Sequence, residues 1–350
     1  MKKIISILIA LSLIVSGVML AGCDGTGNGD DELPEYTLQF AALGGPTFFA
    51  ATVAQFAADL EAATDGRVTV EMTWGYAPPL GYDYLMDQLY DAVFFNPVQC
   101  APDLFPMASI STLPFSFPSA VNHTAAQWAL WEAEYLDARL YDEMKVLWIS
   151  GDQGSGLIMK SKNVTAPADL VGETLHVVPG MQQTIFETLG ASTDPSIAAG
   201  EVSGALAAGT LTGNVKGYTP LPLFGWCDYA YSVTEPKLGS VCFVFAFNLD
   251  SWNALPAADR ATIEGLIGDD NAYGVANAEL MDTLTENGRQ CLVTKGAHFV
   301  EWADIDGQVA PLLAGIWTDW IDARAALDGE AALHLFCEVL GEPAIGYSCP

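Results

Sequence analysis

The sequence predicts an α/β fold with mixed sheets, divided between two lobes. Segments with strand patterns and segments with helix patterns alternate along the chain. Hydrophobic residues make up 51% of the chain, and its 350 residues exceed the length at which a single core usually stops growing. A block at 241–248 is apolar and β-branched enough for a strand that is buried on both faces.

The first half of the chain begins with a strand at 36–42 and a helix at 46–64. Phe49, Val53, Phe56 and Leu60 recur at helical spacing in that helix and predict one buried stripe. Further elements are expected as a strand at 67–74, a helix at 82–92, a long helix at 118–141 and a strand at 145–150.

The second half continues the alternation with new elements. We expect strands at 174–178, 214–218 and 241–248, and helices at 181–189, 200–208, 257–290, 305–327 and 330–340. The helix at 257–290 is very long and is predicted to be broken or softened at Gly265 and Gly274. Lobe I is predicted to hold 36–150 with about 240–265, and lobe II 151–239 with about 266–350.

The N-terminus has the pattern of an export signal. Two lysines precede an apolar stretch at 4–20, and Leu20-Ala21-Gly22-Cys23 follows. This arrangement resembles a bacterial lipobox, which predicts a lipoprotein signal peptide at 1–22 and lipid on Cys23, with acyl chains as a membrane anchor. An uncleaved spanning helix or a soluble secreted protein are the alternatives. Residues 23–35 are acidic and glycine-rich and are expected to form a flexible tether.

Acidic residues outnumber basic ones by 43 to 13, which gives a formal charge of −30. Such a charge disfavours nucleic acid and anionic membrane surfaces as partners. The acidic residues are spread along the chain, which is typical of a solvated surface. A field that attracts a cationic ligand is the other interpretation.

Seven cysteines include six that remain if Cys23 carries lipid, and an even number in an exported protein favours disulfides. We expect Cys337 to pair with Cys349 and Cys227 with Cys242, which leaves Cys100 with Cys291. Free buried thiols are the alternative. The chain has no Cys-x-x-Cys and its four histidines are far apart in sequence, so we expect no metal site.

Catalytic signatures are missing from the sequence. It contains no Gly-x-Ser-x-Gly, no Walker loop and no His-Glu-x-x-His. The glycines at 151–156 do not stand between a strand and a helix in the dinucleotide-binding pattern. A large exported α/β protein of this kind is expected to capture a ligand without a cofactor, and not to be an enzyme.

Several segments resemble one family, the DctP-like solute-binding subunits of tripartite ATP-independent periplasmic (TRAP) transporters. Leu113-Pro-Phe-Ser-Phe-Pro118 is the most specific match, and the order holds from about residue 36 to about residue 287. The other matching segments are 64–71, 80–81, 167–172, 201–209 and 252–256.

The resemblance implies a two-lobe periplasmic-binding-protein-like fold with a long inter-lobe helix and a ligand cleft. Members of this family close their lobes over a ligand and deliver it to membrane subunits that use a sodium gradient, without ATP. A ligand-sensing lipoprotein of the same fold, without transport, is the alternative function, and an exported enzyme is a third.

The sequence departs from the family where its members hold organic acids. His176 stands in place of the family's arginine, and Leu157 stands near a second arginine position. Lys216 could serve a carboxylate instead. By family position, the other candidate ligand-binding residues are Tyr76, Tyr82, Phe95, Asp152, Gln153, Tyr218 and Trp226. These mostly aromatic residues favour an apolar, aromatic or cationic ligand, and Lys216 leaves an organic acid open.

Overall fold

A computed structural model describes residues 33–117, 119–341 and 344–349 of the protein. The predictions for the signal peptide, lipidated Cys23 and nearly all of the tether fall outside these residues. From Glu35 onward, the described residues form one compact unit, so the predicted assignment of segments to two lobes stays a prediction. Within the described part of the chain, no helix combines the length and apolar character needed to cross a membrane.

The first sheet has five strands in the order β2-β1-β3-β10-β4. β1 runs parallel to β2 and β3, whereas β10 runs antiparallel to β3 and β4. All seven residues of β10 are buried, which confirms the strand predicted from the apolar block. The strands are β1 (Tyr36–Ala42), β2 (Val68–Trp74), β3 (Ala92–Phe95), β4 (Met144–Gly151) and β10 (Cys242–Asn248).

The second sheet has six strands in the order β11-β9-β5-β8-β6-β7. It is also mixed, because β5 runs antiparallel to β8 and β9, while β6 runs parallel to β7 and β8. Both sheets confirm the predicted α/β class. The strands are β5 (Ser155–Met159), β6 (Thr174–His176), β7 (Ser192–Thr193), β8 (Gly213–Lys216), β9 (Ser232–Leu238) and β11 (His298–Glu301).

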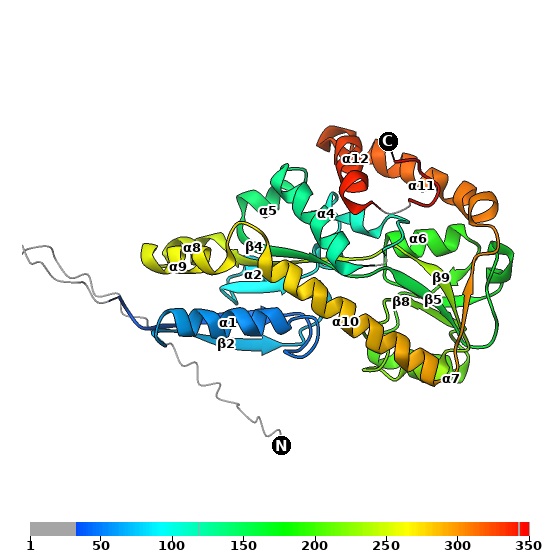
Figure 1. Ribbon diagram of the computed structural model, residues 1–350, viewed down its shortest axis with the longest axis horizontal. Coiled ribbons are helices and arrows are strands. Elements are labelled where there is room, and N and C mark those ends of the chain that lie inside the picture. The colour runs from blue at the N-terminus through cyan, green and yellow to red at the C-terminus, as the bar shows by residue number, and fades with distance from the viewer. Residues whose placement is uncertain (1–32, 118, 342–343, 350) are drawn as a thin grey trace, which may run out of the picture. The chain divides into compact units, whose positions relative to one another are not determined.

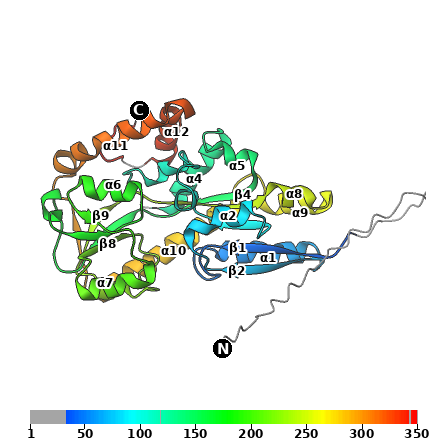
Figure 2. The same ribbon diagram turned by 180° about the vertical axis from the view of Figure 1, so that it is seen from behind.

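Helices cover the sheets as Figures 1 and 2 show. Around the first sheet lie α1 (Ala51–Ala63), α2 (Gly81–Met86), α3 (Pro97–Cys100), α4 (Ala120–Glu132), α5 (Ala138–Asp142), α8 (Leu249–Ala254) and α9 (Ala257–Ile267). Around the second lie α6 (Met181–Thr188) and α7 (Val202–Ala208), and the tail forms α11 (Ala310–Ala323) and α12 (Gly329–Leu340). The two tail helices confirm the prediction, and Trp317 and Trp320 of α11 are buried.

Three predicted helices in the first half of the chain differ from the structure. The helix at 46–64 starts only at Ala51, because 46–50 form turns and place Phe49 outside the helix, although Val53, Phe56 and Leu60 are buried as expected. The helix at 82–92 ends at Met86, and the one at 118–141 is interrupted between α4 and α5. Asp137 lies in the interruption between α4 and α5, where its carboxylate accepts hydrogen bonds from the backbone N–H groups of Met107 and Ala108.

The helix predicted at 257–290 is two helices, α9 and α10 (Ala272–Thr294). The break falls neither at Gly265 nor at Gly274 but between Gly268 and Asn271, which both adopt positive φ. Asn271 is fixed there because its side chain hydrogen-bonds both the N–H and the C=O of Ile149 in β4, at 3.1 and 2.8 Å.

Helix α10 passes along both sheets, as Figures 1 and 2 show, and two of its glycines explain how closely it packs. A Cβ on Gly274 would lie 2.2 Å from the carbonyl oxygen of Ile149, and a Cβ on Gly288 would lie 2.1 Å from that of Tyr218. At each of these points, the helix backbone therefore lies directly against another backbone segment.

The disulfides are Cys227–Cys291 and Cys337–Cys349, while Cys100 and Cys242 are free. The predicted Cys337–Cys349 pair is confirmed. The predicted Cys227–Cys242 and Cys100–Cys291 pairs are wrong, because the chain passes from the second sheet into the first between 227 and 242 and carries Cys242 away from Cys227. Cys291, on α10, is the thiol that reaches Cys227.

Candidate functional site

A cavity of about 580 Å³ lies between the two sheets. This volume is within the usual range for small-molecule sites. On the first-sheet side its walls follow the carboxyl ends of the parallel strands β1, β2 and β3, as segments 43–49, 74–78 and 96–99. Ligand sites of open α/β sheets form at this end of the strands.

The second-sheet side supplies two further wall segments. These are 178–182, which follows β6, and 216–226, which begins at the last residue of β8. The two connections that cross between the sheets, with the adjoining strand residues, contribute lining residues at 152–155 and 239–243. Thr112 and Ala199 also line the cavity. Residues from both sheets therefore face one cavity.

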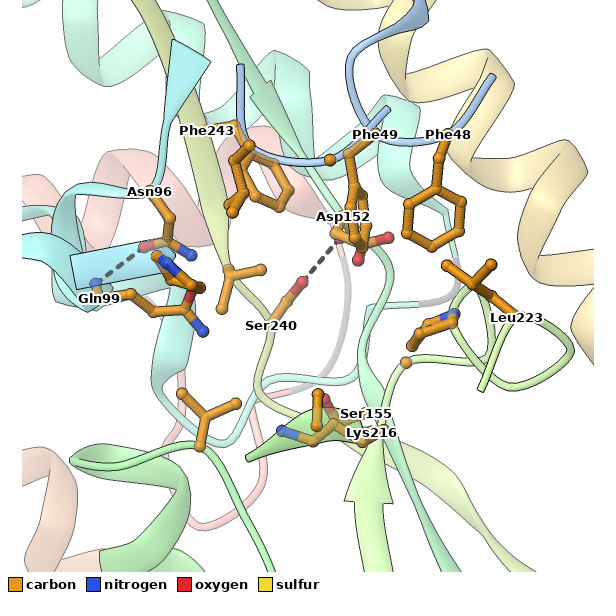
Figure 3. A pocket seen from close by; sticks show the side chains of 18 of the residues that line it. Phe48, Phe49, Asn96, Gln99, Asp152, Ser155, Lys216, Leu223, Ser240 and Phe243 are labelled. Atoms are coloured by element: carbon orange, nitrogen blue, oxygen red, sulfur yellow. Dashed lines mark hydrogen bonds between the residues drawn. The ribbon is translucent and has the colours of Figure 1, made fainter. Parts of the chain in front are cut away.

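Aromatic rings form much of the wall, and Figure 3 shows three of them, Phe48, Phe49 and Phe243, together at one end of the cavity. The ring centroids of Phe48 and Phe49 are 4.1 Å apart, and those of Phe49 and Phe243 are 5.5 Å apart. From the second-sheet side, Phe224 and Trp226 stack at 4.9 Å. Flat apolar ligands gain most from such walls.

Lys216 is the one basic side chain among the described residues that line the cavity. It is the last residue of β8 and is partly buried. Burial lowers the pKa of its ammonium group to about 8, so Lys216 is mostly protonated at pH 7. Within the described residues, the ammonium group has no hydrogen-bond or ion-pair partner, so it is available to an anion.

Asn96 provides a second available donor. Its side-chain oxygen accepts a hydrogen bond from the Gln99 N–H at 3.1 Å, because Asn96 caps α3, and this contact fixes the orientation of the amide. The Asn96 nitrogen is buried and has no partner in the described structure. In Figure 3 the Asn96 nitrogen lies on the opposite side of the amide from the oxygen that Gln99 binds. A buried donor without a partner costs free energy that a ligand acceptor would recover.

Asp152 and Gln153 lie where the chain passes from β4 to β5. Asp152 is the one acidic side chain in the described lining, and burial raises the pKa of its carboxyl group to about 6. Gln153 is held on both sides: its oxygen accepts from the Lys237 ammonium group, and its nitrogen donates to Asp282 of α10 at 2.5 Å. Asp282 also accepts from the Ser119 hydroxyl at the start of α4. Hydrogen bonds thus connect the cavity wall at Gln153 to α10, and α10 to the start of α4.

Five of the nine residues predicted to bind ligand line the cavity: Tyr76, Asp152, Gln153, Lys216 and Trp226. The Tyr76 hydroxyl donates to the carbonyl oxygen of Phe94 at 2.6 Å, so its ring rather than its hydroxyl is free to meet a ligand.

The other four predicted residues are not among those that line the cavity. Tyr82 donates to Glu143 at 2.7 Å, and Phe95 is fully buried against Phe105. Tyr218 donates to Glu235 at 2.9 Å. Each of these three side chains packs into the protein beside the cavity.

His176, the residue predicted to stand in the family's arginine position, is buried in β6, and its ring centroid lies 6.5 Å from that of Trp226. Its ring nitrogens lie 3.2 Å from the Asn214 side-chain oxygen and 3.0 Å from the Ile197 carbonyl oxygen. Burial, with the charge of Lys216 next, lowers the pKa of His176 to about 4, so the ring is neutral at pH 7. A neutral ring donates one hydrogen bond and accepts one. If the oxygen and nitrogen of the Asn214 amide are exchanged, the amide nitrogen, which otherwise has no partner among the described residues, donates to the His176 ring.

The cavity is also lined by residues that were not predicted to bind ligand, among them Phe48, Phe49, Asn96, Gln99 and Phe243. Phe48 and Phe49 fall within the helix predicted at 46–64, although the preceding Gly44-Gly45-Pro46 indicates a loop. Asn96-Pro97 directly after an apolar strand is likewise a turn signal at a strand's carboxyl end. The described residues hold no group of three or more His, Cys, Asp or Glu side chains placed to bind a metal ion.

Comparison with known proteins gives a consistent result. A family model described as DctP, bacterial extracellular solute-binding protein, family 7, matches residues 44–310. The outer membrane transporter protein TsaT of Comamonas testosteroni is 26% identical over 202 residues, which are 56% of this chain and 58% of TsaT. The match thus spans less than two thirds of that curated relative.

Solved structures share the fold at low sequence identity. A TRAP solute-binding protein from a marine metagenome, specific for aromatic acid ligands and bound to metahydroxyphenylacetate, has a TM-score of 0.76 at 22% identity, over 88% of this chain and 99% of that one. A TRAP periplasmic solute-binding protein of Bordetella bronchiseptica with bound mandelate has a TM-score of 0.75 at 23% identity, over 87% and 99%.

Proposed function

Since the chain belongs to the DctP family, family 7 of the bacterial extracellular solute-binding proteins, we propose that it captures an aromatic carboxylic acid in the cavity and delivers it to TRAP membrane subunits. The observation that carries the ligand class is Lys216, a cation without a counter-ion among the described residues, in a cavity walled by aromatic rings.

Lys216 takes the part that an arginine plays in other members of the family. A carboxylate beside it would gain a charge-assisted hydrogen bond, and the aromatic walls would hold the apolar body of the ligand. The bound ligands of the structural relatives, metahydroxyphenylacetate and mandelate, combine these two features. A purely cationic ligand would place its charge beside Lys216 and is disfavoured.

Capture would proceed by closure of the two sides of the cavity over the ligand. The ligand shifts the equilibrium only if it binds the closed arrangement better than the open one. Contacts from both sheets meet this condition, because Asn96 and Phe243 come from the first-sheet side and Lys216 and Trp226 from the second. A ligand that touched only one side would gain nothing from closure.

A panel of small molecules tests the ligand class on the purified mature chain. Benzoate, phenylacetate and mandelate are expected to raise the melting temperature, and at 100 times Kd the gain is about 2.7 kcal/mol. Benzamide and benzylamine keep the ring but remove the negative charge, and succinate keeps the charge but removes the ring. Stabilisation by benzylamine or succinate alone would overturn the proposed class.

Lys216→Met tests the proposed anchor, because methionine keeps most of the side-chain volume. We expect benzoate affinity to fall by about 2 kcal/mol or more, roughly thirtyfold, because the carboxylate loses its charged partner in a desolvated site. Lys295→Met is the matched control, since Lys295 pairs with Asp228 away from the cavity lining. Equal affinity in both variants would remove Lys216 from the site.

The anchor is a separate part of the proposal. Export with lipid on Cys23 would hold the binding domain near its membrane subunits and raise its effective concentration there. Mass spectrometry of the mature N-terminal peptide is expected to show acyl chains on Cys23. Cys23→Ser is expected to move the protein into the soluble fraction, and unchanged membrane association would contradict the anchor.

A further inference from the structure

Asp152 is an acidic group in a cavity whose proposed ligand is itself an acid. The residue is 6% exposed. One carboxylate oxygen, Oδ1, accepts from the Gln153 N–H at 2.8 Å, whereas Oδ2 has no hydrogen-bond partner among the described residues. An ionised carboxylate can accept about four hydrogen bonds. The group is therefore short of donors.

Space is available beside the unpartnered oxygen. Gly217 is its neighbour, and a Cβ built on Gly217 would meet only Asp152 Oδ2, at 3.6 Å. Both residues line the cavity. The missing side chain at Gly217 leaves room for a ligand atom to reach Oδ2.

The nearby protein charges do not satisfy Asp152. Lys237 attracts the carboxylate, but its ammonium group donates to Gln153 and lies over the Tyr218 ring, 5.0 Å from the centroid. Asp282 repels the carboxylate from the side of α10. Burial has the largest effect on the pKa of Asp152 and raises it to about 6. At pH 7.5 the carboxylate is therefore mostly ionised, although water and protein donors solvate it only in part.

We propose that Asp152 is a second ligand anchor, which accepts a hydrogen bond from a hydroxyl or ammonium donor on the ligand, away from the carboxylate that Lys216 holds. Figure 3 shows Asp152 near Phe49 and Lys216 near Ser155, separated in the view, so one ligand can meet each with a different group. The ligand class narrows to aromatic acids that carry a donor. This inference rests on the proposed function and makes Asp152 a specificity-determining residue.

Matched pairs of acids test the inference through their Kd values at pH 7.5 by calorimetry. The pairs are benzoate with 3-hydroxybenzoate, 4-hydroxybenzoate and 4-aminobenzoate, phenylacetate with its hydroxylated forms, and 3-phenylpropanoate with 3-(4-hydroxyphenyl)propanoate. A donor that bonds a charged group is expected to tighten at least one pair about tenfold or more over its parent acid. Equal affinity within every pair would overturn the inference.

Asp152→Asn assigns the preference to this residue. The amide is nearly isosteric and can keep its oxygen toward the Gln153 N–H, so the parent acids should bind at least as well as before. The ratio within the preferred pair should fall to near one. Asp319→Asn makes the same charge change on an exposed part of α11 and should leave the ratio intact. A ratio that survives Asp152→Asn would overturn the inference.

Gly217→Ala is a second variant in case Asp152→Asn folds poorly. Its methyl group would stand in ordinary contact with Oδ2 and fill the place of the ligand donor, without changing the charge. Donor-bearing acids should lose affinity more than their parents do, and a uniform loss would count against the inference. Failure of every aromatic acid to bind the wild-type protein would instead overturn the proposed function.

Discussion

Gly288→Ala is predicted to destabilise the protein and to weaken ligand binding together. The new Cβ would lie 2.1 Å from the Tyr218 carbonyl oxygen and 2.6 Å from its carbonyl carbon. Real Cβ contacts are essentially never under 3.0 Å, so α10 or the segment at Tyr218 must move by roughly 0.9 Å. Lys216 and Gly217 directly precede Tyr218, so the displacement reaches the cavity wall.

The expected size follows from two opposing contributions. Overpacking costs about 1–3 kcal/mol, and the upper end applies here because the clash is with backbone and no rotamer change relieves it. Alanine in place of glycine inside a helix returns about 1 kcal/mol. The net loss in the free energy of unfolding is therefore about 2 kcal/mol, measurable by urea or guanidinium denaturation with ligand affinity by calorimetry.

Two other glycines are matched controls for this change. Gly265→Ala on α9 is expected to stabilise by about 0.5–1 kcal/mol, because nothing lies within 4 Å of its Cβ position. Gly274→Ala should destabilise about as much as Gly288→Ala, because its Cβ would lie 2.2 Å from the Ile149 carbonyl oxygen, but should affect ligand binding less, because Ile149 does not line the cavity. A Gly288→Ala protein as stable as wild type would refute the reasoning.

Three further outcomes are expected. Replacing Cys227 and Cys291 by Ser should lower the free energy of unfolding by up to about 4 kcal/mol, measured by chemical denaturation, and should weaken ligand binding beside Trp226, measured by calorimetry. Replacing Cys337 and Cys349 by Ser should cost about 3 kcal/mol and leave Kd unchanged. Equal changes in Kd for the two double variants would contradict this prediction. Because the protein is strongly acidic, added salt should speed association of an acidic ligand in stopped-flow fluorescence, and a slower rate would point to a cation. The affinity of the wild-type protein for an acid should fall as pH rises through about 8, where Lys216 loses its proton. In Lys216→Met the affinity should stay level between pH 7 and 9.5. A wild-type affinity that is equally level over this range would count against Lys216 as the anchor.

The sequence predicted the fold best where pattern and burial agree. β10 was predicted because its segment is apolar and β-branched, and all seven of its residues are buried in the structure. The helix predicted at 181–189 is α6, whose buried residues Gln182, Ile185 and Phe186 recur at helical spacing. β5 and β9 were missed because β5 begins among the glycines at 151–156 and β9 contains Pro236 and four charged or polar residues. Strand order and the two wrong disulfide pairs depend on long-range topology, which local patterns do not encode.

Whether a predicted residue lines the cavity depends on how near it lies to the end of its strand. His176 and Asn214 are partners in the parallel pair of β6 and β8, and Lys216 lies two residues further along β8. The same strand pair therefore has a histidine enclosed between its neighbours and a lysine at the open end. Family position predicted His176 as a ligand contact, and Lys216 was a candidate as the nearby basic residue that could replace the missing arginine. The register shows that the lysine lines the cavity, whereas the histidine does not.

The close contacts of α10 restrict how the two sides of the cavity can move. Gly274 and Gly288 are 14 positions apart, which is about 21 Å along the helix. The helix packs against β4 at one of these glycines and against the Tyr218 segment at the other, close to the disulfide between Cys227 and Cys291. Because these two contacts keep α10 from sliding along either sheet or separating from it, we expect the sheets to approach each other by rotation about the helix axis or by bending of the helix near Asp282. Spin labels at the two ends of α10 should keep their separation when ligand binds, while labels on the loops of Phe48 and Leu223 should draw together.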